Sequence, residues 1–219
     1  SFDPLKDFEY IGLINEVPMT FVTKNDLPVK AIGELPAYVK AHADKVTLAN
    51  AGVGSASHLC GLLFMSQIGQ SLTTVPYKGA APAITDLIGG QVDMLCDQTT
   101  NTTQHIKAGK IRALAVTTDK RLSTLPDLPT MAESGFKGFN VSVWHALYAP
   151  KGTPKPVIDK LVAALQEGLK NPELGKRFAE LGTEPVASDR ATPEALHKFL
   201  AAEIDKWTPI IRKANIYAD

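Results

Sequence analysis

A turn rich in glycine and serine is the part of this sequence best suited to hold a charged group. Residues 49–58 read Ala-Asn-Ala-Gly-Val-Gly-Ser-Ala-Ser-His, between a β-like run and an apolar-periodic run that predicts a helix. Gly52 and Gly54 allow positive φ angles and a close approach of the backbone to another group. Ser55 or Ser57 can cap the helix, whose first amides have no internal partners. Because these amides lie at the positive end of the helix dipole, the turn predicts a seat for a carboxylate or phosphate.

The first turn of that predicted helix supplies the hydrogen-bond donors of this candidate anion-binding site, called the anion seat below. Ser55, Ala56, Ser57 and His58 offer backbone amides, two hydroxyls and an imidazole. The alternative is a plain strand-to-helix turn, for which glycine and serine are also ordinary choices, with His58 simply a polar helical residue. Both interpretations stay open from the residues alone.

Two further polar loops follow predicted strands. The first carries Tyr77, Lys78 and Gly79, which offer a phenol, a cation and a flexible backbone position. The second is a run of mixed donors and acceptors: Asp97, Gln98, Thr99, Thr100 and Asn101. In the alternative interpretation Lys78 is a solvated loop lysine and Asp97 is only the N-cap of the next helix.

Strands and short helices alternate from about residue 46 to residue 118. The predicted strands are 46–49, 73–76, 91–96 and 111–116, and the helices between them are 57–68, 82–88 and one that ends near residue 108. This alternation is typical of βαβ units and predicts a parallel sheet. Since ligands bind at the carboxyl ends of such strands, loops 50–58, 76–81 and 97–101 should open on one edge.

The flanking regions complete an α/β pattern. They contain one bent strand or two short strands over 8–23 with the bend at Pro18, a helix over 31–42, a loop over 119–138, a strand over 139–149, and helices over 156–170, 172–181 and 192–213.

Composition excludes several classes of protein. The chain has 219 residues, with 23 basic and 23 acidic side chains, so it lacks the positive charge of a nucleic-acid binder. No apolar run approaches the roughly 18 residues of a membrane span.

Cys60 and Cys96 lie in predicted core elements without a CxxC motif or a Cys/His cluster. We interpret them as small buried apolar groups, with a disulfide or a metal site as the alternative.

Residue patterns for catalysis and cofactor binding are missing from the sequence. It has no GxSxG nucleophile elbow, and its five histidines are scattered without metal-ligand spacing. The pair Gly52-Val53-Gly54 lacks the third glycine of a dinucleotide fingerprint and the Gly-Lys-Ser/Thr of a P-loop. The remaining polar residues therefore suit holding a ligand better than transforming it, and no cofactor is expected.

One segment closely resembles a hallmark of a known family. Residues 75–93 read Val-Pro-Tyr-Lys-Gly-Ala-Ala-Pro-Ala-Ile-Thr-Asp-Leu-Ile-Gly-Gly-Gln-Val-Asp, as in the solute-binding receptors of tripartite tricarboxylate transporters, the TctC or Bug proteins. Further stretches fit this family: residues 3–8, 51–55, 109–117, 125–130 and 149–154. The resemblance covers essentially the whole chain.

The resemblance implies an α/β protein of the type II periplasmic binding class, in which two Rossmann-like lobes close on a ligand by a hinge. One lobe would be residues 20–138, and the other residues 1–19 with 139–219. The ligand would be a small carboxylate, and the partners would be the membrane subunits of the transporter. The family's ligand loop matches Ala51–His58 and its strand-end acid loop matches Asp97–Asn101.

In one respect the sequence departs from the family pattern. Family members begin with a further stretch of roughly 70 to 100 residues, compatible with ordinary two-lobed proportions. We therefore expect the lobe of residues 1–19 and 139–219 to be incomplete and the lobe of residues 20–138 to be complete. Exposed strand edges of the incomplete lobe should favour self-association. Two other functions stay open: a sensory partner that presents a ligand to a signalling system, and an α/β enzyme that uses the anion seat for a phosphate.

Overall fold

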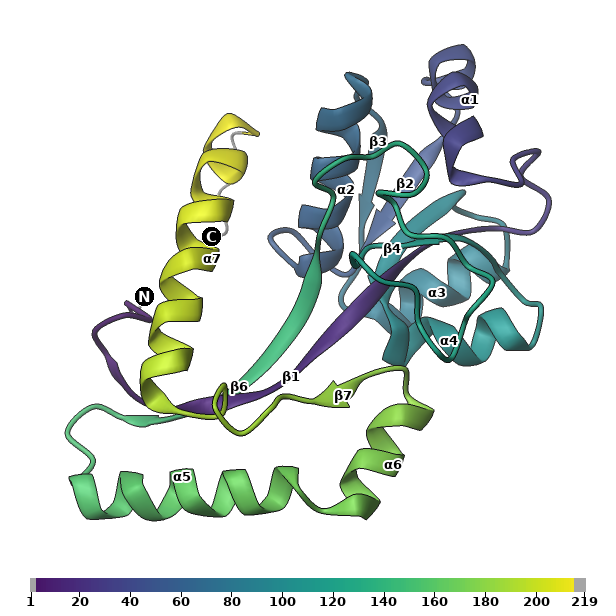
Figure 1. Ribbon diagram of the computed structural model, residues 1–219. Helices are drawn as coiled ribbons and strands as arrows, with labels where there is room; N and C mark the ends of the chain where they lie inside the picture. Colours follow the sequence, from purple (N-terminus) through teal and green to yellow (C-terminus); the bar gives the residue numbers. More distant parts are fainter. Residues whose placement is uncertain (1–2, 215–219) are drawn as a thin grey trace. The chain divides into compact units, whose positions relative to one another are not determined.

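The computed structural model of the chain describes residues 3–214 (Figure 1). Its elements, in chain order, are β1 (Phe8–Thr23), η1 (Ile32–Glu34), α1 (Leu35–His42), β2 (Thr47–Asn50), α2 (Ala56–Ile68), β3 (Thr73–Pro76), α3 (Ala80–Ile88), β4 (Met94–Gln98), α4 (Thr99–Lys107), β5 (Arg112–Val116), β6 (Ser142–Pro150), α5 (Lys155–Leu169), α6 (Pro172–Glu180), β7 (Glu184–Pro185) and α7 (Pro193–Lys213).

The described residues divide into two compact units. The smaller unit contains residues 3–17 and 144–213, and the larger contains residues 18–143 with Ala214. The divisions after Val17 and Val143 lie near the lobe boundaries predicted from the sequence. Residues 215–219 of the second predicted lobe lie outside the described residues.

The sheet of the larger unit is mixed, not parallel. Its strand order is β3-β2-β4-β1-β5, in which β2 pairs parallel with both β3 and β4. Strand β1 pairs antiparallel with β4 and with β5. The strands predicted to be parallel, β2 to β5, therefore run in one direction, and the prediction did not include the antiparallel β1 that lies between β4 and β5. Helical crossovers fix the directions of β2 to β5, but they carry no information on a strand from earlier in the chain that inserts between β4 and β5.

Strand β1 is continuous over 16 residues and serves both units. The sequence left open one bent strand or two, and the structure has one. Residues 19–23 pair with β4 in the larger unit, while Asn15 and Glu16 pair with β7 in the smaller unit. Pro18 lies where the two stretches meet, at a position where the missing N–H costs no ladder bond in either of these pairings.

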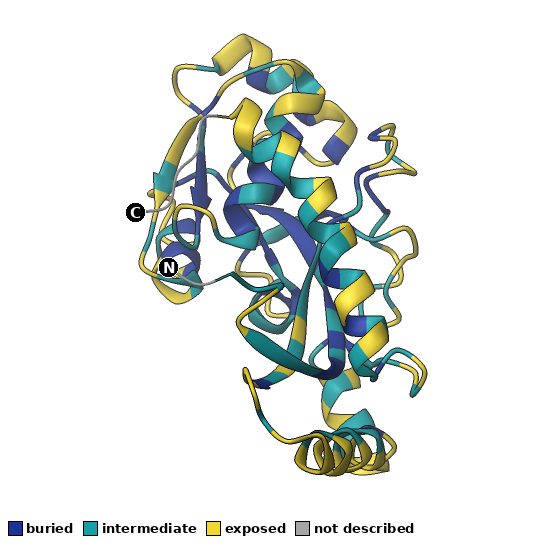
Figure 2. Ribbon diagram, turned by 90° about the vertical axis from the view of Figure 1, so that its left-hand side faces the viewer, coloured by how far each residue is buried: buried dark blue, intermediate teal, exposed yellow. Residues whose placement is uncertain are grey.

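Helices cover both faces of the larger unit's sheet. Because side chains alternate along a strand, Ala49 and Leu95 face one side and form a core with Leu87 of α3. On the opposite side Phe21 contacts Phe64 of α2, with ring centroids 4.7 Å apart. Strands β2 and β4 inside this sheet are buried, whereas the edge strand β3 is mostly exposed, and Figure 2 shows both buried and exposed strands.

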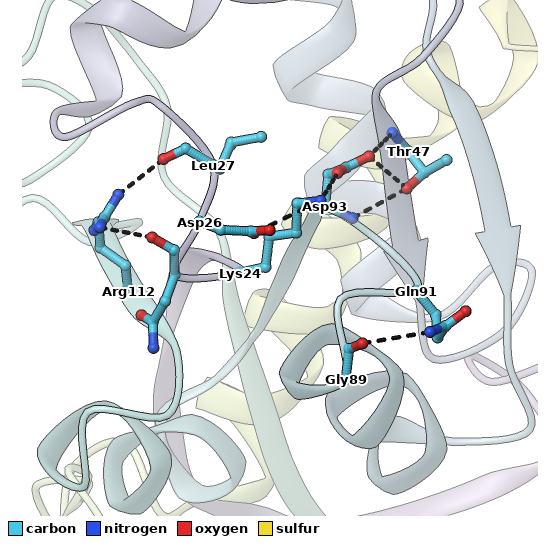
Figure 3. Close-up of polar contacts among 9 residues, drawn as sticks. Lys24, Asp26, Leu27, Thr47, Gly89, Gln91, Asp93 and Arg112 are labelled. Carbon is cyan, nitrogen blue, oxygen red and sulfur yellow. Dashed lines mark hydrogen bonds and ion pairs between the residues drawn. The ribbon is translucent and has the colours of Figure 1, made fainter.

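A polar cluster closes the edge of the sheet where β2 and β4 begin (Figure 3). Asp93 accepts hydrogen bonds at Oδ2 from Thr47 N (2.8 Å) and Thr47 Oγ1 (2.9 Å), and its Oδ1 pairs with Lys24 Nζ at 3.0 Å. Arg112 donates to the carbonyls of Asn25 and Leu27 and so orders the loop after β1. This edge is stabilised by structural contacts, and it lies at the opposite ends of β2 and β4 from the predicted site.

The smaller unit packs helices α5, α6 and α7 with β6, β7 and the first half of β1. Glu16 of β1 forms a bidentate ion pair with Arg190, and both N–O distances are 3.0 Å. Gly12 of β1 lies so close to the chain at Ala191 that a Cβ there would be 2.7 Å from the backbone carbon.

Candidate functional site

The turn between β2 and α2 has the backbone geometry that its sequence predicted. Gly52 and Gly54 have φ angles of 126° and 78°, a region that side chains other than glycine rarely adopt. Ser55 is the N-cap of α2: its Oγ accepts from His58 N at 3.2 Å and donates to Gly52 O at 2.7 Å. The turn is therefore closed by the serine that precedes the helix.

This capping leaves two backbone amides at the start of α2 without a hydrogen-bond partner among the described residues. The amides of His58 and Leu59 donate to Ser55, but those of Ala56 and Ser57 donate to no atom in the described part of the chain. Orphan amides at a helix N-terminus carry partial positive charge and bind anions. The amides of Ala56 and Ser57 are thus available as donors to an anion.

His58 helps to shape the turn. Its Nδ1 accepts a hydrogen bond from Gly54 N at 3.1 Å, which places the proton of the neutral ring on Nε2. The side chain is buried, and burial lowers the pKa of the imidazole. The neutral imidazole stabilises the glycine turn as a hydrogen-bond acceptor, and it supplies no fixed positive charge to a ligand.

The second predicted loop is joined to the first by its backbone. Tyr77 N donates to Asn50 O at 2.9 Å, and Gly79 N donates to Ala51 O at 3.2 Å. The Tyr77 hydroxyl donates to Asp86 Oδ2 at 2.7 Å, and burial together with this bond raises the pKa of Tyr77 to about 12. The Tyr77 hydroxyl is therefore hydrogen-bonded to a residue of α3.

Lys78 projects from the same loop. Its side chain is exposed, and no ion pair or hydrogen bond within residues 3–214 fixes it. The structure thus leaves the choice between a ligand contact and a solvated lysine as the sequence left it.

The third loop places an acid at the end of β4. Asp97 is 4% exposed, and its Oδ1 and Oδ2 accept from Gln98 N (2.9 Å) and Asn101 Nδ2 (3.1 Å). Burial raises the pKa of Asp97, although both hydrogen bonds act in the opposite direction. Gln98, and not Asp97, is the N-cap residue of α4, and Thr99 is fully buried.

Cys60 and Cys96 form a disulfide, so their interpretation as free apolar thiols was wrong. Cys60 lies in α2 and Cys96 lies in β4, directly before Asp97. The two residues are 36 positions apart in the sequence, and only the packing of α2 on β4 brings their Cα atoms to 6.2 Å. The Ser57 hydroxyl reinforces this link by donating to Cys96 O at 2.6 Å.

The structure brings the three predicted loops to one edge of the sheet. Strands β2, β3 and β4 run parallel as neighbours, so their carboxyl ends coincide, and the N-termini of α2, α3 and α4 follow directly. Three helix N-termini at one edge make it electropositive. The hydroxyl of Tyr77 and the imidazole of His58, in contrast, are engaged within the protein.

Asn50 is the contributor that sequence reasoning missed. It is 2% exposed, its Oδ1 accepts from Gly52 N at 3.0 Å, and its carbonyl accepts from Tyr77 N. An asparagine two residues before a glycine is a typical turn-forming signal, and that signal was present within residues 49–58.

Residues 3–214 contain neither a metal-binding cluster nor a helix suited to span a membrane. No group of three or more His, Cys, Asp or Glu side chains there is arranged to hold a metal ion. No helix in that range combines the length and the apolar character that crossing a bilayer requires.

Comparison with known proteins places the chain in a family. The model of the tripartite tricarboxylate transporter family receptor, TctC, matches residues 1–216. The chain belongs to the TctC family. A TctC relative from Agrobacterium vitis, described as the UPF0065 protein in the TAR-I ttuE-ttuC' intergenic region, is 51% identical over 98% of this chain and 62% of its own length. The chain thus spans less than two thirds of this relative.

Solved TctC-type structures share the fold. The periplasmic binding protein BugD has a TM-score of 0.92 and 52% identity, over 100% of this chain and 73% of that one. Rhodopseudomonas palustris MatC with bound malate gives 0.90 and 34%, over 96% and 72% of the two chains. Rpa4515 with adipate, from R. palustris, gives 0.91 and 32%, over 98% and 71%. The periplasmic-binding-protein fold predicted from the sequence is confirmed.

Proposed function

We propose that this protein is an extracytoplasmic solute-binding protein that captures a small di- or tricarboxylate, or a related organic acid, for a tripartite tricarboxylate transporter. The observation that carries the proposal is the pair of unpartnered amides of Ala56 and Ser57 at an edge where three helices begin. Solved relatives with malate and adipate support a carboxylate as the occupant.

The chemistry of this edge favours holding over transforming. Glycines at 52 and 54 carry no side chain, so a carboxylate can approach the amides closely. His58 is turned to Gly54, and Asp97 is tied to Gln98 and Asn101, so neither forms a nucleophile–base pair with a hydroxyl among the described contacts. The family model is that of a receptor, and BugD is described as a binding protein.

We further propose that the protein works in the periplasm. Disulfides persist in oxidising compartments such as the bacterial periplasm and are rare in the cytosol. The Cys60–Cys96 disulfide agrees with that location, as does the description of BugD as periplasmic.

A thermal-shift panel tests the ligand class. We would compare acetate, succinate, malate, adipate and citrate with phosphate and sulfate. A ligand at about 100 times its Kd adds about 2.7 kcal/mol to the unfolding free energy. For a chain of this size that corresponds to a Tm increase of about 5 to 11 °C. We expect such a shift with one or more di- or tricarboxylates.

Two variants test whether the ligand that causes the thermal shift binds at the start of α2. Ser55→Ala removes the cap that organises the seat and should reduce the shift, whereas Asp26→Asn, at the opposite edge, should retain it. Stabilisation by phosphate and by no carboxylate would contradict the proposal and favour an enzyme with a phosphorylated substrate. An equal response of the Ser55→Ala variant would contradict the placement of the site.

Delivery to a transporter needs a cellular test. We expect deletion of the gene to abolish uptake of the radiolabelled carboxylate identified in the panel, and the wild-type gene to restore it. Unchanged uptake in the deletion strain would contradict the transport role while leaving carboxylate binding intact.

A further inference from the structure

The first turn of α2 is fastened to the end of β4 at two points that converge on one residue. Ser57 Oγ donates to Cys96 O at 2.6 Å, and Cys60 is bonded to Cys96 through the disulfide. Both cysteines have no exposed surface, and Ser57 is 3% exposed. The link therefore lies inside the protein.

The residues at the two ends of this link are next to the candidate ligand groups. Ala56 and Ser57 precede Cys60 by four and three positions, which is one helical turn. Asp97 directly follows Cys96. The disulfide therefore fixes the spacing between the unpartnered amides of α2 and the buried acid of β4.

The body of α2 has its own packing, independent of the disulfide. Phe64 lies against Phe21 with centroids 4.7 Å apart, and Gly61 lies so close to Leu48 that a Cβ would be 2.8 Å from Leu48 Cδ2. These contacts follow Cys60 in the helix. If the disulfide is broken, they keep α2 on the sheet while its first turn is held less tightly.

We propose that the Cys60–Cys96 disulfide, together with the Ser57 hydroxyl, is a positioning element of the ligand site. It holds the anion-binding turn at a fixed distance from Asp97, and its loss weakens carboxylate binding more than it disturbs the rest of the fold. The part of this inference that concerns ligand rests on the proposed function, whereas the part that concerns the turn does not.

Reduction is a balanced exchange with a dithiol reductant. The reductant's thiolate attacks one sulfur, the Cys60–Cys96 bond breaks, and the two cysteine sulfurs end as thiols while the reductant becomes a cyclic disulfide. Because both sulfurs are buried, attack requires the turn to open first. Bound carboxylate should therefore slow reduction.

Hydrogen exchange tests the positioning without requiring a ligand. We would compare the oxidised wild type, the dithiothreitol-reduced wild type, the double variant Cys60→Ala with Cys96→Ala, and Ser57→Ala. The hydrogen-bonded amides of residues 54, 55, 58, 59 and 98 should exchange at least tenfold faster in the reduced protein and the double variant. Amides of α3 and α5 should change less than twofold.

Phe64→Leu is the matched control within the same helix. It weakens the packing against Phe21 but leaves the disulfide in place, so faster exchange should spread over the larger unit without preference for these amides. Unchanged exchange at the amides of residues 54, 55, 58, 59 and 98 in the double variant would overturn the proposal. A uniform rise like that of the Phe64→Leu variant would also overturn it.

Calorimetric titration with malate and adipate separates the two proposals. We expect the double variant to bind at least tenfold more weakly than the oxidised wild type, with Asp26→Asn unchanged. Equal affinity of the double variant and the wild type would overturn the positioning role. If neither acid binds the oxidised wild type while exchange rises only at the amides of residues 54, 55, 58, 59 and 98, the positioning of the turn stands and the proposed ligand class fails.

Discussion

Substitution of Asp93 by asparagine should cost far more stability than the same change at Asp26, although both acids pair with Lys24. The Asp93–Lys24 pair has an N–O distance of 3.0 Å, and the two side chains are only 15% and 21% exposed. Asp26 lies 3.6 Å from the same Nζ and is 76% exposed. The two variants thus compare a buried acid with an exposed acid that pairs with the same lysine (Figure 3).

The expected magnitude follows from the bonds of Asp93. Its Oδ2 accepts two hydrogen bonds from Thr47, and Oδ1 accepts the Lys24 ammonium. Hydrogen bonds to a charged group contribute about 1.5 to 3 kcal/mol and neutral ones about 0.5 to 1.5 kcal/mol. In Asp93→Asn the Thr47 bonds become neutral and an NH2 group faces the lysine. We expect a loss of about 2 to 3 kcal/mol, or about 4 to 12 °C in Tm.

The control and the pH dependence sharpen this prediction. Asp26→Asn should change the unfolding free energy by less than about 0.5 kcal/mol, as for exposed ion pairs. The hydrogen bond to Asp93 raises the pKa of Lys24 above 10.5. The stabilisation is therefore complete below pH 10.5 and is lost as the pH rises through the folded-state pKa, a loss that Asp93→Asn should reduce.

Equilibrium unfolding in urea, followed by far-ultraviolet circular dichroism at pH 7, measures these differences. The slope of free energy against urea should be the same in all three proteins, so that the midpoints report stability. Equal losses in Asp93→Asn and Asp26→Asn would refute the reasoning that burial decides the strength of these contacts.

Four further predictions concern other parts of the chain. Because burial raises the pKa of Asp97, its ionised form opposes folding, and stability from this group falls as the pH rises from 3.8 through the folded-state pKa; Asp97→Asn should flatten that fall in urea unfolding at pH 4 and pH 7. Gly12→Ala places a Cβ against the Ala191 backbone and should lower the unfolding free energy by about 1 to 3 kcal/mol. Gly168→Ala, with no atom near the added Cβ inside α5, should raise it by up to about 1 kcal/mol, and the two midpoints in urea compare them. Ser55→Ala should weaken carboxylate binding in calorimetric titration, and unchanged affinity would contradict its role as cap of the seat.

Local chemistry made much of the site predictable from the sequence. Two glycines before a serine and an apolar-periodic run specified a turn with positive φ, a capped helix and free amides, and the structure has each of them at Gly52, Gly54 and Ser55. The order of strands and helices also placed the three loops on one edge. These features depend on neighbouring residues and on the rule for successive parallel strands.

Features that depend on distant residues were not accessible. The Cys60–Cys96 disulfide needs α2 to lie on β4, and no spacing rule links cysteines 36 positions apart. The place of β1 between β4 and β5 is a matter of topology, and the commitment of Tyr77 to Asp86 depends on where α3 packs. A hallmark motif can therefore owe its residues to folding, although the sequence suggested ligand contact.

An NMR titration of the ¹⁵N-labelled protein with malate and with adipate tests the central claim most directly. The account predicts saturable chemical-shift changes largest at the amides of Gly54, Ala56 and Ser57, with smaller changes at Gln98, and none at residues of the Lys24–Asp93 edge. Saturable changes that leave Ala56 and Ser57 unmoved, or no change with any carboxylate of the panel, would contradict the claim that the start of α2 is a carboxylate seat.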